Sequence, residues 1–221
     1  MAVIPKKLTA LDVVHDAPVI PVIVLHELRH AVPLARALVA GGIRMLEVTL
    51  RTPVALDCVR AMVQEVPEAV AGVGTVRTGA EAEAAQRAGA AFAVSPGFTL
   101  GLARTCAELG LPWLPGVATA SEILAAQEAG LSALKFFPAM QAGGVGLLKA
   151  WQGPFPEVVF CPTGGVQPDN APSLLALGNV ACVGGSWLVP TQALEDRDWA
   201  RITALAREAC ALRPKNTVKT G

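Results

Sequence analysis

Residues 131–139, Leu-Ser-Ala-Leu-Lys-Phe-Phe-Pro-Ala, are the stretch around which the chain is organised. Apolar and aromatic side chains, a glycine before the stretch and a proline near its end predict a buried β-strand. Lys135 lies in the middle of this strand. Burying an ammonium group without a partner is costly, and such a group usually gives up its proton. A neutral, desolvated lysine is a good nucleophile toward a carbonyl carbon.

A plainer alternative is that Lys135 lies on an exposed edge strand or extends to water. Its neighbours Leu134, Phe136 and Phe137 leave little room for a solvated face. The other lysines all lie outside predicted strands, at Lys6, Lys7, Lys149, Lys215 and Lys219. The pattern therefore favours a chemical role for Lys135.

Similar apolar runs recur along the chain, with a helix predicted after each. They begin near residues 18, 43, 69, 90, 111, 131, 157 and 180, at the spacing of one strand–helix unit. Eight such units predict an α/β fold in the form of a single (β/α)8 barrel. The barrel is expected to cover about residues 18–212, and residues 1–221 are expected to form one domain. We expect an N-terminal helix over residues 7–16 and a flexible C-terminal tail, residues 214–221. A doubly wound open sheet is the alternative, because sequence alone does not prove closure.

The composition narrows the class of protein. The chain has 221 residues, 52% of them hydrophobic, and a formal net charge of zero, which gives no support for nucleic-acid binding. Five cysteines without a CxxC spacing indicate reduced thiols in a cytosolic protein. Proline, histidine or charged residues interrupt every apolar run before it reaches the length of a membrane span. We expect a cytoplasmic protein with no membrane or nucleic-acid partner.

Polar residues follow the second and third predicted strands. Strand alternation places Glu47, Thr49 and Arg51 on one face. Glu47 and Arg51 could form a structural ion pair, or act as an acid/base carboxylate beside a guanidinium that binds a substrate carboxylate. Thr75 ends the third strand and is either a plain strand residue or part of the same site.

Glycine pairs end the last two predicted strands. Thr163-Gly164-Gly165 and Gly184-Gly185-Ser186 each put exposed backbone N–H groups beside a hydroxyl. A helix N-terminus after the turn would add its dipole, and a phosphate site after strands seven and eight is a recurring barrel feature. A single glycine pair is equally consistent with a tight turn. The turns Ser95-Pro96-Gly97 and Pro115-Gly116 are interpreted as structural.

The histidines are concentrated before the second strand. His26 and His30 are four residues apart in a helix predicted over residues 26–41, a spacing that can hold a metal ion. A solvated helix face is the favoured interpretation, because no third ligand lies nearby. We therefore expect no metal site.

Together these residues fit cleavage of a 2-keto acid. A lysine imine withdraws electrons, a carboxylate moves the proton, an arginine neutralises the substrate carboxylate, and the glycine turns hold a distal phosphate. This chemistry needs no cofactor. The expected partner is a small-molecule 2-keto acid phosphate.

The sequence closely resembles the bacterial 2-keto-3-deoxy-6-phosphogluconate (KDPG) aldolase family, also called 2-keto-4-hydroxyglutarate (KHG) aldolase. The matching motifs run through most of the chain: EVTLRT (47–52), GVGTV (72–76), SPG (95–97), PG (115–116), LKFFPA (134–139), FCPTGGV (160–166) and GGSWLVP (184–190). The resemblance implies a class I aldolase of the Entner–Doudoroff pathway on a (β/α)8 barrel, usually a homotrimer.

The resemblance also implies residue roles. Lys135 would form the Schiff base, and Glu47 would act as the general acid/base. The substrate-binding residues would be Arg51 and Thr75 for the pyruvyl carboxylate, Pro96 and Phe137 for the pyruvyl pocket, and Thr163, Gly164, Gly165, Gly185 and Ser186 for the distal hydroxyls and phosphate.

Two departures and three alternatives accompany this resemblance. Many relatives carry acidic residues where this chain has His26-Glu27, which touches the barrel mouth, and no aromatic residue follows Asn170.

The alternatives are an aldolase for the galactonate epimer, a non-catalytic sugar-phosphate-binding barrel, and a phosphosugar isomerase or epimerase. Neither of the last two needs Lys135.

Overall fold

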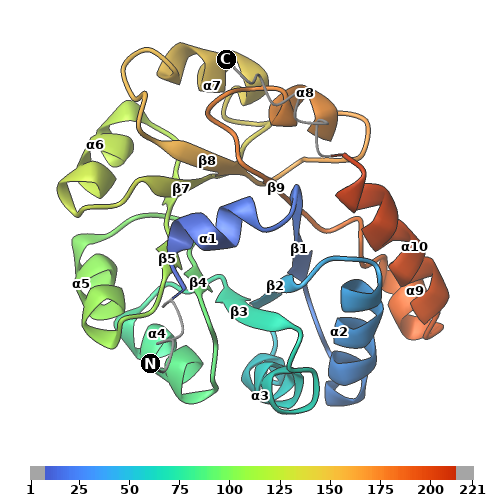
Figure 1. Ribbon diagram of the computed structural model, residues 1–221. Coiled ribbons are helices and arrows are strands. Elements are labelled where there is room, and N and C mark those ends of the chain that lie inside the picture. Colours follow the sequence, from blue (N-terminus) through green and yellow to red (C-terminus); the bar gives the residue numbers. More distant parts are fainter. Residues whose placement is uncertain (1–7, 213–221) are drawn as a thin grey trace, which may run out of the picture.

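The structure is a computed structural model that describes residues 8–212. Figure 1 shows the strands near the centre of the molecule and most of the helices around them. In chain order the elements are α1 (Ala10–His15), β1 (Val19–Ile23), the 3-10 helix η1 (Leu28–His30), α2 (Ala31–Ala40), β2 (Met45–Thr49), α3 (Ala55–Glu65), β3 (Val70–Gly74), α4 (Gly79–Arg87), β4 (Ala93–Val94), α5 (Leu100–Leu109), β5 (Trp113–Leu114), β6 (Gly116–Val117), α6 (Ala120–Glu128), β7 (Ala133–Phe136), α7 (Gly144–Trp151), β8 (Val159–Pro162), α8 (Ala171–Leu175), β9 (Val183–Gly185), α9 (Thr191–Glu195) and α10 (Trp199–Cys210).

The strands pair in parallel throughout the described range. One sheet has the order β5-β4-β3-β2-β1-β9, and a second has the order β6-β7-β8. Only Pro115 separates β5 from β6, because a proline has no N–H to continue the ladder. Two parallel bridges, Phe160–Val180 and Thr163–Gly184, join β8 to the segment that holds β9. The carboxyl ends of the strands therefore lie on one side of the molecule.

Local sequence signals explain where several helices begin. Thr78 and Thr119 each accept a hydrogen bond from the backbone N–H three residues later, at Glu81 and Glu122, and each glutamate bonds back to the cap. Such capping boxes satisfy N–H groups that a helix start leaves unpaired. The helices are short, and none within residues 8–212 is long and apolar enough to cross a membrane.

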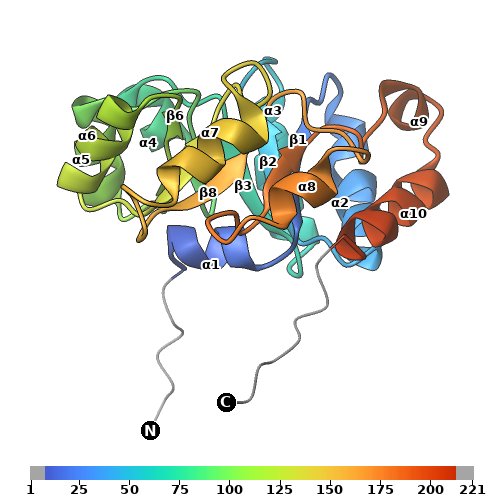
Figure 2. The ribbon, with the colours of Figure 1, turned by 90° about the horizontal axis from the view of Figure 1, so that it is seen from above.

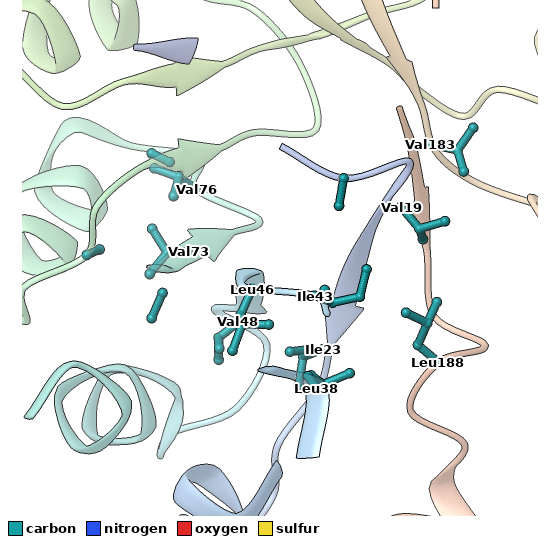
Figure 3. Close-up of a cluster of buried hydrophobic side chains, with 14 of the residues drawn as sticks. Val19, Ile23, Leu38, Ile43, Leu46, Val48, Val73, Val76, Val183 and Leu188 are labelled. Carbon is teal, nitrogen blue, oxygen red and sulfur yellow. The ribbon is translucent and has the colours of Figure 1, made fainter. Parts of the chain in front are cut away.

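Alternation along the strands produces two apolar layers. Leu46 and Val48 of β2 point outward into the larger cluster, which packs the strands against the helices. Figure 3 shows part of this cluster. Met45, one residue before Leu46, points into a second cluster with Ile20, Phe92, Leu114 and the α1 residues Val13 and Val14. Figure 2 shows α1 lying across one side of the strands, so α1 covers the inner cluster at the amino ends of the strands.

The predicted helices differ from the observed ones in three places. The helix expected over residues 26–41 begins later, because residues 26 and 27 form a loop and η1 precedes α2. The helix α9 was not predicted, because Pro190 and its short length hide the signal. The N-terminal helix is confirmed, with bounds shorter than predicted. The predicted flexible tail at 214–221 lies outside the described residues.

Candidate active site

The central lysine of β7 lies against a carboxylate of β2. Lys135 Nζ is 3.4 Å from Glu47 Oε1, and only 5% of Lys135 and 3% of Glu47 are exposed. The neighbouring strands β6 and β8 hold the lysine's backbone on both sides, because Lys135 pairs in register with Gly116 and Cys161. The structure buries Lys135 and also supplies the charged partner that the sequence did not reveal. Removing one member of such a pair leaves an uncompensated buried charge.

Glycines inside the strands make room for this pair and its neighbours. A Cβ atom on Gly74 would lie 2.2 Å from Glu47 Oε1, and one on Gly184 would lie 2.2 Å from Thr163 Oγ1. A Cβ on Gly72 would meet the ring of Phe92 at 2.6 Å. Gly184 was predicted to help bind an anion; its position shows that it also accommodates the Thr163 side chain. Interior strand glycines often mark such close approaches.

Arg51 and Thr75 meet beyond the ends of β2 and β3. Arg51 Nε donates a hydrogen bond of 3.0 Å to Thr75 Oγ1. Thr75 is not a plain strand residue, because it follows β3 with φ at +61°, a conformation that costs free energy for a non-glycine residue. Thr52 Oγ1 donates to Leu25 O at 2.5 Å and ties the Arg51 turn to the end of β1. The predicted alternative of a Glu47–Arg51 ion pair is wrong, since Glu47 pairs with Lys135.

A buried hydrogen-bond chain holds the turn after β4. Trp113 Nε1 donates to Ser95 Oγ at 3.0 Å, and Ser95 Oγ donates to Gly97 O at 2.7 Å. The turn presses on β6, because a Cβ on Gly116 would lie 2.2 Å from Pro96 O. Gly116 is the register partner of Lys135. Pro96 is thereby fixed against β6, the strand next to the one that carries the lysine.

A cavity of about 190 Å³ opens at the carboxyl ends of the strands. Its lining includes Arg51, Phe137, Thr163, Gly164, Gly165, Gly185 and Ser186, which are all predicted site residues. Lys135 and Glu47 are not among the lining residues, but Lys135 Nζ lies 5.2 Å from the centre of the ring of Phe137, which does line the cavity. Thr75 and Pro96 do not line it, although each contacts a neighbouring part of the site.

The two glycine turns form one concave wall, which we call the glycine cradle: Gly164, Gly165, Gly185 and Ser186. Gly164 and Gly165 have φ values of +99° and +73°, so side chains would be strained there. Met140 N donates to Gly164 O at 3.1 Å and fixes the turn. The expected help from a following helix dipole is wrong, because α8 and α9 have five residues each and begin several residues after the glycines.

The histidines do not lie on one solvated helix face. His26 is exposed in the loop after β1, whereas His30 is only 5% exposed. The His30 ring packs edge-on against Trp199, with 6.1 Å between ring centres. Within residues 8–212, no cluster of three or more His, Cys, Asp or Glu residues could hold a metal ion.

Comparison with known proteins agrees with this geometry. The family model for KDPG and KHG aldolases matches residues 11–205. The chain belongs to the KDPG and KHG aldolase family. The KHG/KDPG aldolase of Escherichia coli K12 is 52% identical over 203 residues, covering 92% of this chain and 95% of that protein. The 2-dehydro-3-deoxy-phosphogluconate aldolase of Dickeya dadantii is 51% identical over 205 residues, covering 93% and 96%.

Solved structures of KDPG aldolases share the fold. The Legionella pneumophila KDPG aldolase is 46% identical, superposes with a TM-score of 0.90, and covers 92% of this chain and 99% of its own. That structure holds pyruvate captured as a covalent carbinolamine intermediate. The fold and the family membership therefore rest on sequence and structure together.

Reasoning from the sequence missed two contributors to this aldolase site. Gly74 gave only a weak signal, a glycine inside a strand, and its proximity to Glu47 could not be read from spacing. Trp113 carried no sequence signal for the site, because its indole donates to Ser95, in the turn after β4, 18 residues earlier in the chain.

Proposed function

We propose that the chain is a class I aldolase that cleaves KDPG to pyruvate and glyceraldehyde 3-phosphate, and also cleaves KHG to pyruvate and glyoxylate. The observation that carries this proposal is the buried contact between Lys135 and Glu47 beside the cavity. A binding protein or a phosphosugar isomerase has no need of a buried lysine. The covalent pyruvate in the Legionella pneumophila relative supports the same chemistry.

The reaction starts at the Lys135 amine. Its unprotonated nitrogen attacks the C2 carbonyl of the keto acid, forms a carbinolamine, and loses water to give an iminium ion. Glu47 Oε1, 3.4 Å from Nζ, takes the proton that the amine must lose before attack and returns it to the carbinolamine hydroxyl, which leaves as water, so that Glu47 is again a carboxylate. The iminium ion then serves as the electron sink, so that no metal or cofactor is required.

Glu47 then moves the proton that allows the carbon–carbon bond to break. Its carboxylate accepts the proton of the C4 hydroxyl, the C3–C4 electron pair moves to C3 to form an enamine, and the aldehyde leaves. The protonated Glu47 returns the proton to C3, and water hydrolyses the iminium ion to release pyruvate and free Lys135. One buried carboxylate can act as base and then as acid, because the proton it gains in one step is lost in the next.

The surrounding residues bind and orient the substrate. Arg51, held by Thr75, is positioned to bind the pyruvyl carboxylate through its remaining N–H groups. Phe137 and Pro96 border the pyruvyl group. The glycine cradle and Thr163 bind the distal hydroxyls and the phosphate, because backbone N–H groups and hydroxyls donate to phosphate oxygens and left-handed glycines allow close approach.

The finer architecture belongs to the same proposal. We infer that the two sheets form one closed (β/α)8 barrel in a single domain, which is supported by the continuity of β5 and β6 across Pro115 and by the bridges between β8 and the β9 segment. A homotrimer in the cytoplasm remains the prediction for the assembly and its location. Gel filtration with light scattering would measure the oligomeric state.

The function is tested by steady-state cleavage of three substrates side by side: KDPG, its galactonate epimer and KHG. Pyruvate release is measured with a coupled dehydrogenase. The proposal expects the highest kcat/KM with KDPG, measurable cleavage of KHG, and no turnover of either by Lys135→Ala. Because that variant leaves Glu47 without its partner, the double variant Lys135→Met with Glu47→Gln is the folded control. Substantial turnover by either variant would overturn the imine mechanism, and a preference for the epimer would reassign the substrate.

A further inference from the structure

The side chain of Asn170 contacts the backbone of the glycine cradle. Its Nδ2 donates a hydrogen bond of 3.0 Å to Gly165 O, and its Oδ1 accepts one of 2.9 Å from Gln167 N. Gly165 belongs to the cradle, and Gln167 lines the same cavity. Asn170 is not part of that lining. One side chain behind the cavity therefore binds two backbone groups of its wall, on either side of Val166.

This side chain does not serve the helix that follows it. Asn170 is the N-cap residue of α8, a position where asparagine usually accepts a hydrogen bond from a backbone N–H two or three residues later. Its side chain makes no such bond. Ser173 contacts only the backbone of Asn170, because its N and Oγ both donate to Asn170 O, at 3.2 and 2.7 Å. The Asn170 amide is therefore committed to the turn before the helix.

The contact with Gly165 O sets the direction of the next N–H group. The C=O of Gly165 and the N–H of Val166 belong to one planar trans peptide unit, in which they point in opposite directions. Asn170 holds this carbonyl from one side. Met140 N holds the carbonyl of Gly164 in the same manner, at 3.1 Å. The two contacts together fix the N–H groups of Val166 and Gly165.

These two N–H groups are available to a ligand. Within residues 8–212, neither group donates a hydrogen bond to another part of the protein. Gly165 and Val166 both line the cavity, and only 4% of Val166 is exposed. A buried N–H group without a protein partner needs another acceptor, and successive backbone N–H groups in a turn of this kind bind anions.

We propose that Asn170 is a positioning residue for the phosphate group of the substrate: by holding Gly165 O, it directs the Val166 N–H toward a phosphate in the glycine cradle. This inference rests on the proposed aldolase function and deepens it, because it gives Asn170 a part in distinguishing the two substrates. KDPG carries a phosphate on C6, whereas KHG ends in a carboxylate at C5. Loss of the Asn170 contact should therefore weaken binding of KDPG and leave KHG unaffected.

Two variants separate the two contacts of this side chain. Asn170→Ala removes both hydrogen bonds. Asn170→Asp keeps the acceptor for Gln167 N, but it loses the donor and places an oxygen against Gly165 O. In both variants KM for KDPG is expected to rise by about fivefold, the scale of one lost hydrogen bond. KM for KHG, and kcat for both substrates, should stay at the wild-type values.

Ser173→Ala is the matched control. It removes one hydrogen bond from the same helix start and leaves the contact with Gly165 in place, so both KM values should remain those of the wild type. An equal rise of KM for KDPG and KHG in the Asn170 variants would indicate a general structural effect and overturn the positioning role. A wild-type KM for KDPG in either Asn170 variant, or the same rise in Ser173→Ala, would also overturn it.

Inorganic phosphate gives a readout that needs no turnover. Calorimetric titration is expected to give a dissociation constant about fivefold higher in both Asn170 variants than in the wild type and Ser173→Ala. Equal dissociation constants in the four proteins, or no binding of phosphate by the wild type, would overturn the proposal. If the binding differs as expected and the wild type does not cleave KDPG, the aldolase function fails and the role of Asn170 in holding the phosphate site stands.

Discussion

Adding one methyl group at Gly74 should move the Glu47 carboxylate without removing any catalytic group. A Cβ at this position would lie 2.2 Å from Oε1, 2.7 Å from Cγ and 2.8 Å from Cδ of Glu47. Contacts of Cβ atoms below 3.0 Å are essentially never observed. In Gly74→Ala the Oε1 atom must therefore retreat by about 0.8 Å if the backbone stays in place. The φ of Gly74 is not in the left-handed region, so alanine adds no backbone strain.

The size of the effect follows from the role proposed for Glu47. Oε1 is the atom that faces Lys135 Nζ at 3.4 Å, so the displacement acts directly on the proton-transferring pair. A misplacement of about 1 Å can cost about a hundredfold in rate, which corresponds to about 2.7 kcal/mol of transition-state stabilisation. We expect kcat for KDPG cleavage to fall by about that factor.

The assay is steady-state pyruvate release from KDPG, with a melting curve for each protein. Gly101→Ala is the matched control, because a Cβ at Gly101 meets nothing within 4 Å and the position lies in helix α5. The control should keep wild-type kinetics. Wild-type kcat in a well-folded Gly74→Ala protein would refute the claim that the carboxylate position limits the reaction.

Three further predictions follow from the structure. Arg51→Lys keeps the charge but loses the two-point grip on a carboxylate, so KM for KDPG should rise by about tenfold while kcat changes little; an unchanged KM in steady-state kinetics would contradict the assignment. Trp113→Phe removes the indole donor that holds the turn containing Ser95 and Pro96. We expect kcat for KDPG cleavage to fall in Trp113→Phe and to stay near the wild-type value in Trp151→Phe, whose indole contacts Phe136 instead, when the two variants have similar melting temperatures. Equal kcat values in the two variants would contradict this role. Burial raises the pKa of the Cys58 and Cys106 thiols to about 11 from 9.0. The folded protein then holds thiol protons that the unfolded chain releases, so the free energy of unfolding should be unaffected below pH 9 and should fall as the pH rises toward 11. Urea unfolding across this range measures it, and a profile that is flat, or unchanged when both cysteines are replaced by alanine, would contradict the prediction.

The sequence predicted the strand–helix order because each element carries its own local signal. Threonine caps and apolar runs act over a few residues, and such signals mark the beginnings of helices such as α4 and α6. Lys135 could be singled out for a similar reason, since its neighbours within one strand already indicate burial.

What the sequence did not predict depends on contacts between distant segments. The partner of Lys135 is a residue 88 positions earlier, and the partner of the Trp113 indole is Ser95, in the turn after β4. His30 was expected in solvent because its own helix pattern places no constraint on it, whereas tertiary packing against Trp199 buries it. Thr75 gave no sign of its positive φ, which the turn after β3 imposes.

The central claim is that Lys135 forms an imine with the substrate keto acid. The most direct test is borohydride reduction in the presence of pyruvate, followed by peptide mass mapping of every lysine. A reduced pyruvyl adduct is predicted on Lys135, with none on the helix residue Lys149, whose side chain is exposed. A folded protein that yields no adduct, or that carries the adduct on another lysine, would contradict the claim.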